Sequence, residues 1–167
     1  MTLAELDGLT ADAARAEFLR CCGSARWAEG MARRRPFASK AGLLAAAEEE
    51  WALTGEKDRL EAFAAHPKIG GKDALREKFA ATAQWAKGEQ AGAAAADEAT
   101  LDALARGNAD YEARFGFIFI VCASGRSAAE LLSSLRARLP NAREAELKTA
   151  AAEQAKITRL RLEKLLA

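Results

Sequence analysis

Apolar residues recur three and four positions apart along most of the chain, which is the spacing of one face of a helix. A residue that often caps helix amino termini precedes several of these stretches, as Ser24 precedes Trp27 and Met31. The same start signal occurs at Thr2, Thr10, Ser24 and Ser39. Proline cannot continue a helix, so Pro36, Pro67 and Pro140 are expected between helices. The pattern predicts a series of helices joined by loops.

The second half of the chain continues this pattern. Ser127 with Glu130, and Asn141 with Glu144, have the spacing of a capping box, so each pair predicts the start of a helix. The last helix is predicted to be the longest. Its inward stripe contains three apolar and three polar residues: Leu147, Ala151, Gln154, Thr158, Arg161 and Leu165.

One run, from Phe117 to Ala123, is continuously apolar and has strand character. No second strand is predicted to pair with it, so a buried extended segment is the better interpretation. Its backbone groups would need other hydrogen-bond partners, and a polar ligand could be one of them.

Composition supports helix almost throughout. Valine appears once in 167 residues, while alanine is the commonest residue. We therefore predict an all-α protein, a single-domain bundle of about eight helices around one core, spanning residues 1–167. The net charge of +1 does not favour nucleic-acid binding. No signal peptide or membrane span is recognisable, so we expect a soluble, cytoplasmic protein.

The cysteines predict neither a disulfide framework nor a zinc site, because Cys21 and Cys22 are adjacent and Cys122 is isolated. With a single histidine in the chain, no metal is expected. The basic run Arg33 to Arg35 could contact an anionic ligand. A solvated helix end is the favoured interpretation, because cations are stabilised near helix carboxyl termini.

Three polar residues are candidates for chemistry. His66 precedes Pro67 and should be held extended where a helix stops. It could be an acid/base group with Glu89, although a lone histidine is more often structural, and Glu89 could simply begin a helix. Arg161 on the inward stripe needs an anionic partner, either internal, for example Glu112, or a ligand carboxylate.

Taken together, these residues resemble the 2-oxo-4-hydroxy-4-carboxy-5-ureidoimidazoline (OHCU) decarboxylase family, over almost the whole chain. The order and spacing of many short motifs carry the resemblance. These are Cys22 to Met31, Arg35-Pro36-Phe37, Trp51, Phe63 to Gly70, Glu89 to Gly92, Asn108 to Tyr111, Arg114 to Gly116, Phe119 to Ala123 and Lys156 to Leu162.

The resemblance implies an all-helical, cofactor-free enzyme of urate degradation, with a homodimer common in the family. It implies His66 and Glu89 as catalytic residues. It also implies substrate contacts from Pro67, Gln90, Phe119, Ile120, Val121, Cys122, Ala123 and Arg161. One departure is Ala86, where several relatives carry a serine that contacts the ligand.

Two other functions remain open at this point. A neighbouring urate-pathway hydrolase would not release carbon dioxide. A helical interaction module, using Arg33 to Arg35 to bind an acidic partner, would tolerate replacement of His66.

Overall fold

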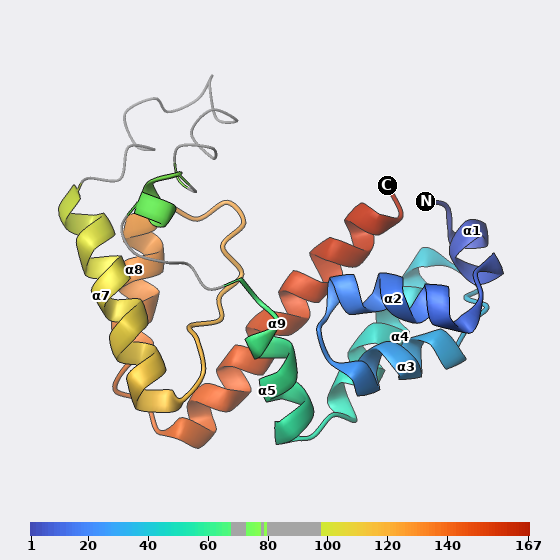
Figure 1. Ribbon diagram of the computed structural model, residues 1–167, viewed down its shortest axis with the longest axis horizontal. Helices are drawn as coiled ribbons and strands as arrows, with labels where there is room; N and C mark the ends of the chain where they lie inside the picture. The colour runs from blue at the N-terminus through green and yellow to red at the C-terminus, as the bar shows by residue number, and fades with distance from the viewer. Residues whose placement is uncertain (68–72, 78, 80–97) are drawn as a thin grey trace. The chain divides into compact units, whose positions relative to one another are not determined.

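The computed structural model describes residues 1–67, 73–77, 79 and 98–167 (Figure 1). Every regular element in these ranges is a helix, which confirms the predicted fold class. None of the described helices has a stretch long and apolar enough to cross a membrane. We predicted one core, whereas the contacts divide the chain into two compact units. The first contains residues 1–66 and 147–167, and the second contains residues 67–146.

The first unit contains five complete helices and most of a sixth. They are α1 (Leu3–Gly8), α2 (Ala11–Cys21), α3 (Ala25–Arg33), α4 (Lys40–Ala52), α5 (Glu56–Ala64) and, from Leu147 onward, α9 (Arg143–Leu165). The predicted caps are confirmed, because the side chains of Thr2, Thr10, Ser24 and Ser39 each accept a hydrogen bond from the backbone three residues on.

Two tryptophans join these helices through their indole N–H groups. Trp27 of α3 is fully buried and donates to the Ala47 carbonyl of α4 at 3.0 Å. Trp51 of α4 donates to the Ala151 carbonyl of α9, also at 3.0 Å. Each bond satisfies the one polar atom of a large apolar ring, so the aromatic core gains packing without leaving a donor unpaired. Phe18 packs edge-on against Trp27.

The basic run Arg33 to Arg35 lies at the end of α3 with Arg33 and Arg34 exposed, as predicted for a solvated helix end, but each of its side chains has a partner within the chain. Arg34 pairs with Glu50 at 2.6 Å, and Arg35 is part-buried and donates to the Leu9 carbonyl at 2.7 Å. Arg33 pairs with a glutamate one turn earlier in α3. These partners come mostly from α1 and α4, so local sequence could not reveal them. Because the charges are already paired within the chain, the run offers little support for an interaction module.

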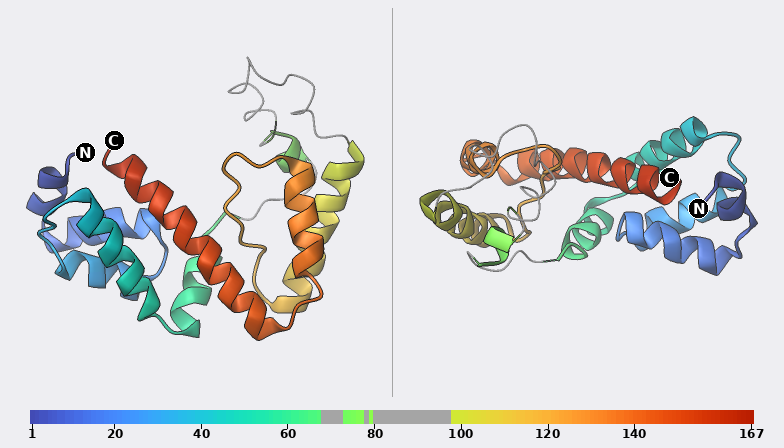
Figure 2. Two further views of the ribbon diagram at one scale, coloured as in Figure 1. Left: turned by 180° about the vertical axis from the view of Figure 1, so that it is seen from behind. Right: turned by 90° about the horizontal axis from the view of Figure 1, so that it is seen from above.

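The second unit is built around two long helices. These are α7 (Glu98–Phe115) and α8 (Ala128–Arg138), which lie side by side (Figures 1 and 2). A Cβ added at Gly107 of α7 would lie 2.6 Å from a Leu135 methyl carbon of α8, so glycine permits this close approach. Residues 73–77 are also helical. The apolar cluster comprises Leu75, Phe79, Leu101, Leu104, Ala128, Leu131, Leu132 and Leu135.

The segment 117–123 forms neither helix nor strand, as predicted, but only Phe117 and Ile120 are buried and its other five residues are half-buried. Gly116, with φ +78°, ends α7 in a conformation that favours glycine. The Ile120 carbonyl accepts a hydrogen bond from Arg138 at 2.7 Å. One backbone group of this segment therefore has a side chain of the same unit as its partner, in line with the expected need for non-strand partners.

Arg138 and Glu146 form a buried ion pair in the second unit. The Arg138 side chain is 10% exposed and the Glu146 side chain is 0% exposed, with 2.5 Å between Nε and Oε1. The Tyr111 hydroxyl donates to the same carboxylate at 2.5 Å, and the Asn141 amide donates to its other oxygen at 3.2 Å. The helix start predicted at Asn141 is close to the observed one, but α9 begins at Arg143, so Ala142 rather than Asn141 precedes its first residue.

We expect Glu146→Leu to lower the free energy of unfolding by about 3–5 kcal/mol, because the Arg138 guanidinium would remain buried without its carboxylate. Urea unfolding followed by circular dichroism measures this change. Glu29→Ala is the matched control, since its pair with Arg33 is exposed on both sides and should contribute less than about 1 kcal/mol. Equal losses in the two variants would contradict the assigned importance of the buried pair.

Candidate functional site

His66 lies just beyond the carboxyl end of α5. Ala65 is the C-cap, and the His66 backbone N–H donates to the Phe63 carbonyl at 3.3 Å. Pro67 follows and is exposed. The predicted position, where a helix stops before a proline, is confirmed. The ring is half-buried and faces a polar group of α9.

That polar group is Gln154, which was not predicted as a site residue. Its Oε1 lies 2.5 Å from His66 Nε2, and its Nε2 donates to Thr158 Oγ1 at 3.2 Å. Gln154 is fully buried, and Thr158 is 6% exposed. The sequence signal was present, because both residues interrupt the otherwise apolar stripe of the last helix. Nothing in the sequence indicated that Gln154 contacts His66.

Arg161 continues the same helical face, one turn beyond Thr158. It is partly buried, and its guanidinium donates to the Cys21 carbonyl at 3.4 Å. Among the described residues of the first unit, no carboxylate forms an ion pair with it. An internal acidic partner in this unit is therefore not found, and the guanidinium has donors left for an anion.

The environment lowers the pKa of His66. Burial is the largest cause, and the positive charge of Arg161 acts in the same direction, while the hydrogen bond with Gln154 opposes them. The ring is therefore neutral at neutral pH. A neutral imidazole can accept a proton and return it, and an arginine close enough to affect its pKa can hold an anionic ligand beside it.

The adjacent cysteines take no part in this chemistry. Cys21 and Cys22 are buried, and burial raises the pKa of each thiol to about 11. A thiol with such a pKa is protonated at neutral pH and is a poor nucleophile. Across the described ranges, the structure brings together no group of three or more side chains suited to hold a metal ion.

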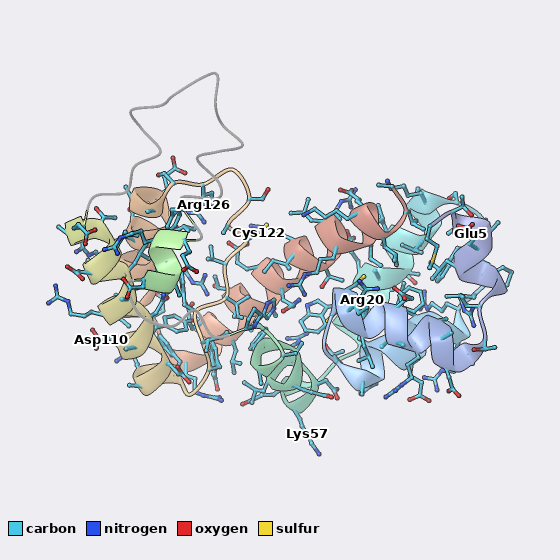
Figure 3. All side chains as sticks on the ribbon, turned by 45° about the horizontal axis from the view of Figure 1, so that its top comes forward. Glu5, Arg20, Lys57, Asp110, Cys122 and Arg126 are labelled. Atoms are coloured by element: carbon cyan, nitrogen blue, oxygen red, sulfur yellow. The ribbon has the colours of Figure 1, made fainter. Side chains whose placement is uncertain are left out.

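The remaining predicted site residues belong to the second unit or lie outside the described residues. Residues 119–123 belong to the second unit, on the loop between α7 and α8, and Cys122 of this loop is half-buried (Figure 3). Pro67 also belongs to that unit. Glu89 and Gln90, together with Ala86, lie outside the described residues. The structure thus brings together two of the predicted site residues, His66 and Arg161.

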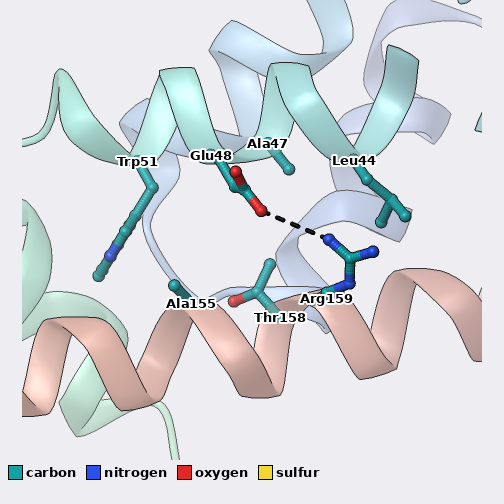
Figure 4. A pocket seen from close by; sticks show the side chains of 7 residues that line it. All are labelled: Leu44, Ala47, Glu48, Trp51, Ala155, Thr158 and Arg159. Atoms are coloured by element: carbon teal, nitrogen blue, oxygen red, sulfur yellow. Dashed lines mark hydrogen bonds and ion pairs between the residues drawn. The ribbon is translucent and has the colours of Figure 1, made fainter. Parts of the chain in front are cut away.

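A groove between α4 and α9 is lined by none of the predicted site residues (Figure 4). Glu48 and Arg159 form an ion pair across it at 3.4 Å. The lining residues are Leu44, Ala47, Glu48, Trp51, Ala155, Thr158 and Arg159.

The described structure is all-helical, and its first unit places the Arg161 guanidinium close enough to His66 to affect the pKa of the imidazole. Comparison with known proteins identifies the family. Residues 7–163 match the family model described as OHCU decarboxylase. The chain therefore belongs to the OHCU decarboxylase family, and the resemblance seen in the sequence is confirmed.

Two curated relatives illustrate this similarity. The uric acid degradation bifunctional protein TTL of Arabidopsis thaliana is 41% identical over 152 residues, covering 89% of this chain and 46% of the relative. The 2-oxo-4-hydroxy-4-carboxy-5-ureidoimidazoline decarboxylase of Amia calva is 36% identical over 103 residues, covering 60% of this chain and 57% of the relative. The chain thus spans about half the length of these relatives.

Solved structures agree with this assignment. A crystal structure of OHCU decarboxylase in the presence of (S)-allantoin matches with a TM-score of 0.72 and 39% identity, covering 90% of this chain and 96% of the other. A structure of (S)-allantoin synthase, 20% identical, matches with a TM-score of 0.73 over 98% of this chain and 54% of the other, and supports the fold alone.

The lowered pKa of His66 predicts a pH dependence of stability. Because the folded-state pKa lies below the ordinary value of 6.5, the unfolded chain binds more protons between the two values. The stability advantage of the neutral, buried ring is present above pH 6.5 and is lost as the pH falls. The free energy of unfolding of the wild type should therefore decrease more on acidification than that of His66→Asn, measured by urea unfolding across this range. If the difference in free energy of unfolding between the wild type and His66→Asn does not change with pH, the lowered pKa of His66 is contradicted.

Proposed function

We propose that this protein catalyses the cofactor-independent decarboxylation of OHCU to (S)-allantoin in urate degradation. Family membership supports this activity. The single observation that carries it is the pair formed by a half-buried, neutral His66 and a neighbouring Arg161 without a carboxylate partner among the described residues of its unit. The first can move a proton, and the second can bind the carboxylate of the substrate.

The chemistry of the substrate explains why such a site suffices. OHCU bears a carboxylate and a hydroxyl on one ring carbon, next to a ring carbon–nitrogen double bond. The electron pair released with carbon dioxide can move into that double bond, so the substrate supplies its own electron sink. The protein then has to orient the substrate and manage protons, without a coenzyme or a metal.

The roles follow from this scheme. His66 is the general acid/base nearest the reacting carbon, and delivery of a proton from one face sets the (S) configuration. A well-placed acid/base group contributes about 10²- to 10⁴-fold in rate. Glu89 is its partner and orients the polar edge of the substrate, and Gln90 provides an amide contact. Pro67 and the segment 119–123 complete the proposed substrate contacts.

The cellular setting is also part of the proposal. We propose a cytoplasmic enzyme that acts as a homodimer on this small molecule, with neither nucleic acid nor membrane as a partner. The near-zero net charge supports the absence of nucleic-acid binding.

We expect His66→Asn to abolish accelerated formation of (S)-allantoin, because an amide does not act as a general acid or base at neutral pH. The helical circular-dichroism spectrum should be kept. The assay generates the substrate from urate with urate oxidase and hydroxyisourate hydrolase. It follows (S)-allantoin by circular dichroism, with a chelator present and no coenzyme added. Released carbon dioxide, trapped in the same reaction, separates decarboxylation from hydrolysis of 5-hydroxyisourate. Normal turnover by the variant would remove His66 from the mechanism.

Arg161→Met should lower the rate of allantoin formation sharply with little change in melting temperature. The guanidinium gives directional hydrogen bonds to a carboxylate that an apolar side chain cannot replace. Arg159→Met is the matched control, because Arg159 lies on the same helix but is exposed and paired with Glu48. Its rate should stay near that of the wild type. If Arg161→Met loses stability but keeps its rate per folded molecule, the substrate-binding role is refuted.

A further inference from the structure

The ring of His66 has two nitrogens, and in the neutral form one of them carries the proton. Nε2 faces the Oε1 atom of Gln154 at 2.5 Å. A carbonyl oxygen only accepts hydrogen bonds, so this contact requires a proton on Nε2. If the NH₂ group of Gln154 faced the ring instead, Nε2 would have to accept the hydrogen bond. The position of the imidazole proton therefore depends on which end of the Gln154 amide faces the ring.

Thr158 orients that amide. Gln154 is fully buried, so both ends of its amide need partners within the protein. Its NH₂ group donates to the Thr158 hydroxyl oxygen at 3.2 Å, which leaves its carbonyl for His66. Thr158 also lies close enough to Cys22 to lower the pKa of its thiol, against the larger and opposite effect of burial.

We propose that Gln154 is a positioning residue that holds His66 in the tautomer protonated on Nε2, so that Nδ1 is the atom that exchanges a proton with the substrate. The kinetic part of this assignment rests on the proposed function, whereas the tautomer itself does not. His66, Gln154 and Thr158 form a directed chain of hydrogen bonds inside the first unit, in which His66 donates to Gln154 and Gln154 donates to Thr158.

This arrangement suits an acid/base group. Both nitrogens are donors in the imidazolium, so the bond from Nε2 to Gln154 persists whether the ring is neutral or charged. Only Nδ1 changes its protonation, and the ring need not rotate during the cycle. The same bond opposes the effects of burial and Arg161 on the His66 pKa. Loss of the Gln154 carbonyl should therefore lower that pKa further.

The single histidine makes the tautomer directly measurable. Protein labelled with ¹⁵N-histidine gives one imidazole in a long-range ¹H–¹⁵N correlation spectrum. In the wild type above the His66 pKa, we expect Nε2 to have the shift of a protonated nitrogen and Nδ1 that of an unprotonated one. In Gln154→Leu we expect a mixture of tautomers and a lower titration midpoint.

Two further variants keep the test decisive if Gln154→Leu does not fold. Thr158→Val removes the hydroxyl with little change in volume and should also allow tautomer exchange, while Thr158→Ser keeps the hydroxyl and should preserve the wild-type spectrum. A wild-type spectrum with the proton on Nδ1 would overturn the proposal. So would an unchanged tautomer and titration midpoint in a folded Gln154→Leu or Thr158→Val protein.

Kinetics add a readout that a purely structural role would not change. In Gln154→Leu we expect kcat to fall by about tenfold or more at a nearly unchanged KM, and by less than the about 10²- to 10⁴-fold that the acid/base group itself contributes. The acid limb of the pH–rate profile should shift to lower pH along with the NMR titration. An unchanged kcat and pH profile would overturn the positioning role. If the wild type shows the predicted tautomer but does not decarboxylate OHCU, the role of Gln154 in fixing the tautomer is supported and the proposed function is refuted.

Discussion

The requirement that buried polar groups be paired organises both units of this protein. In the second unit, Arg138 and Glu146 are nearly or fully removed from solvent, and Tyr111 joins them. Arg138 also holds the Ile120 carbonyl, so one buried cation ties α8 to the start of α9 and to the extended loop after α7. The loop can remain extended without a partner strand because a side chain takes over part of the bonding that a sheet would provide.

The same requirement shapes the site in the first unit, with a different outcome. Gln154 and Thr158 are neutral and satisfy one another, so they can be buried without the large cost of a buried charge. His66 joins them through Nε2. Arg161, at the partly buried end of the same helical face, donates to a backbone carbonyl and pairs with no carboxylate among the described residues of this unit. Polar pairing is therefore complete for the amide of Gln154 and incomplete for the guanidinium of Arg161.

Several features were predictable because they depend on residues close together in sequence. Ser24 and the other caps start helices by accepting hydrogen bonds from backbone N–H groups three residues further along the chain. His66, before Pro67, marks the end of a helix. The extended run was predictable because its apolar residues have no helical spacing. The helix start predicted at Asn141 was one residue early, because α9 begins at Arg143. By contrast, the partners of Arg34 and Arg35 could not be predicted, because they come from helices distant in the chain.

The sequence by itself determined the all-α class, most helix starts and the family, because caps, periodicity and ordered motifs are local properties of the chain. It also marked His66 and Arg161 as residues that need an explanation. Only the tertiary structure decided which atoms they meet. The contact between His66 and Gln154 joins residues 88 positions apart, and that between Arg161 and Cys21 joins residues 140 positions apart. Such contacts depend on how α9 packs against α2 and the end of α5, and no local pattern encodes that packing.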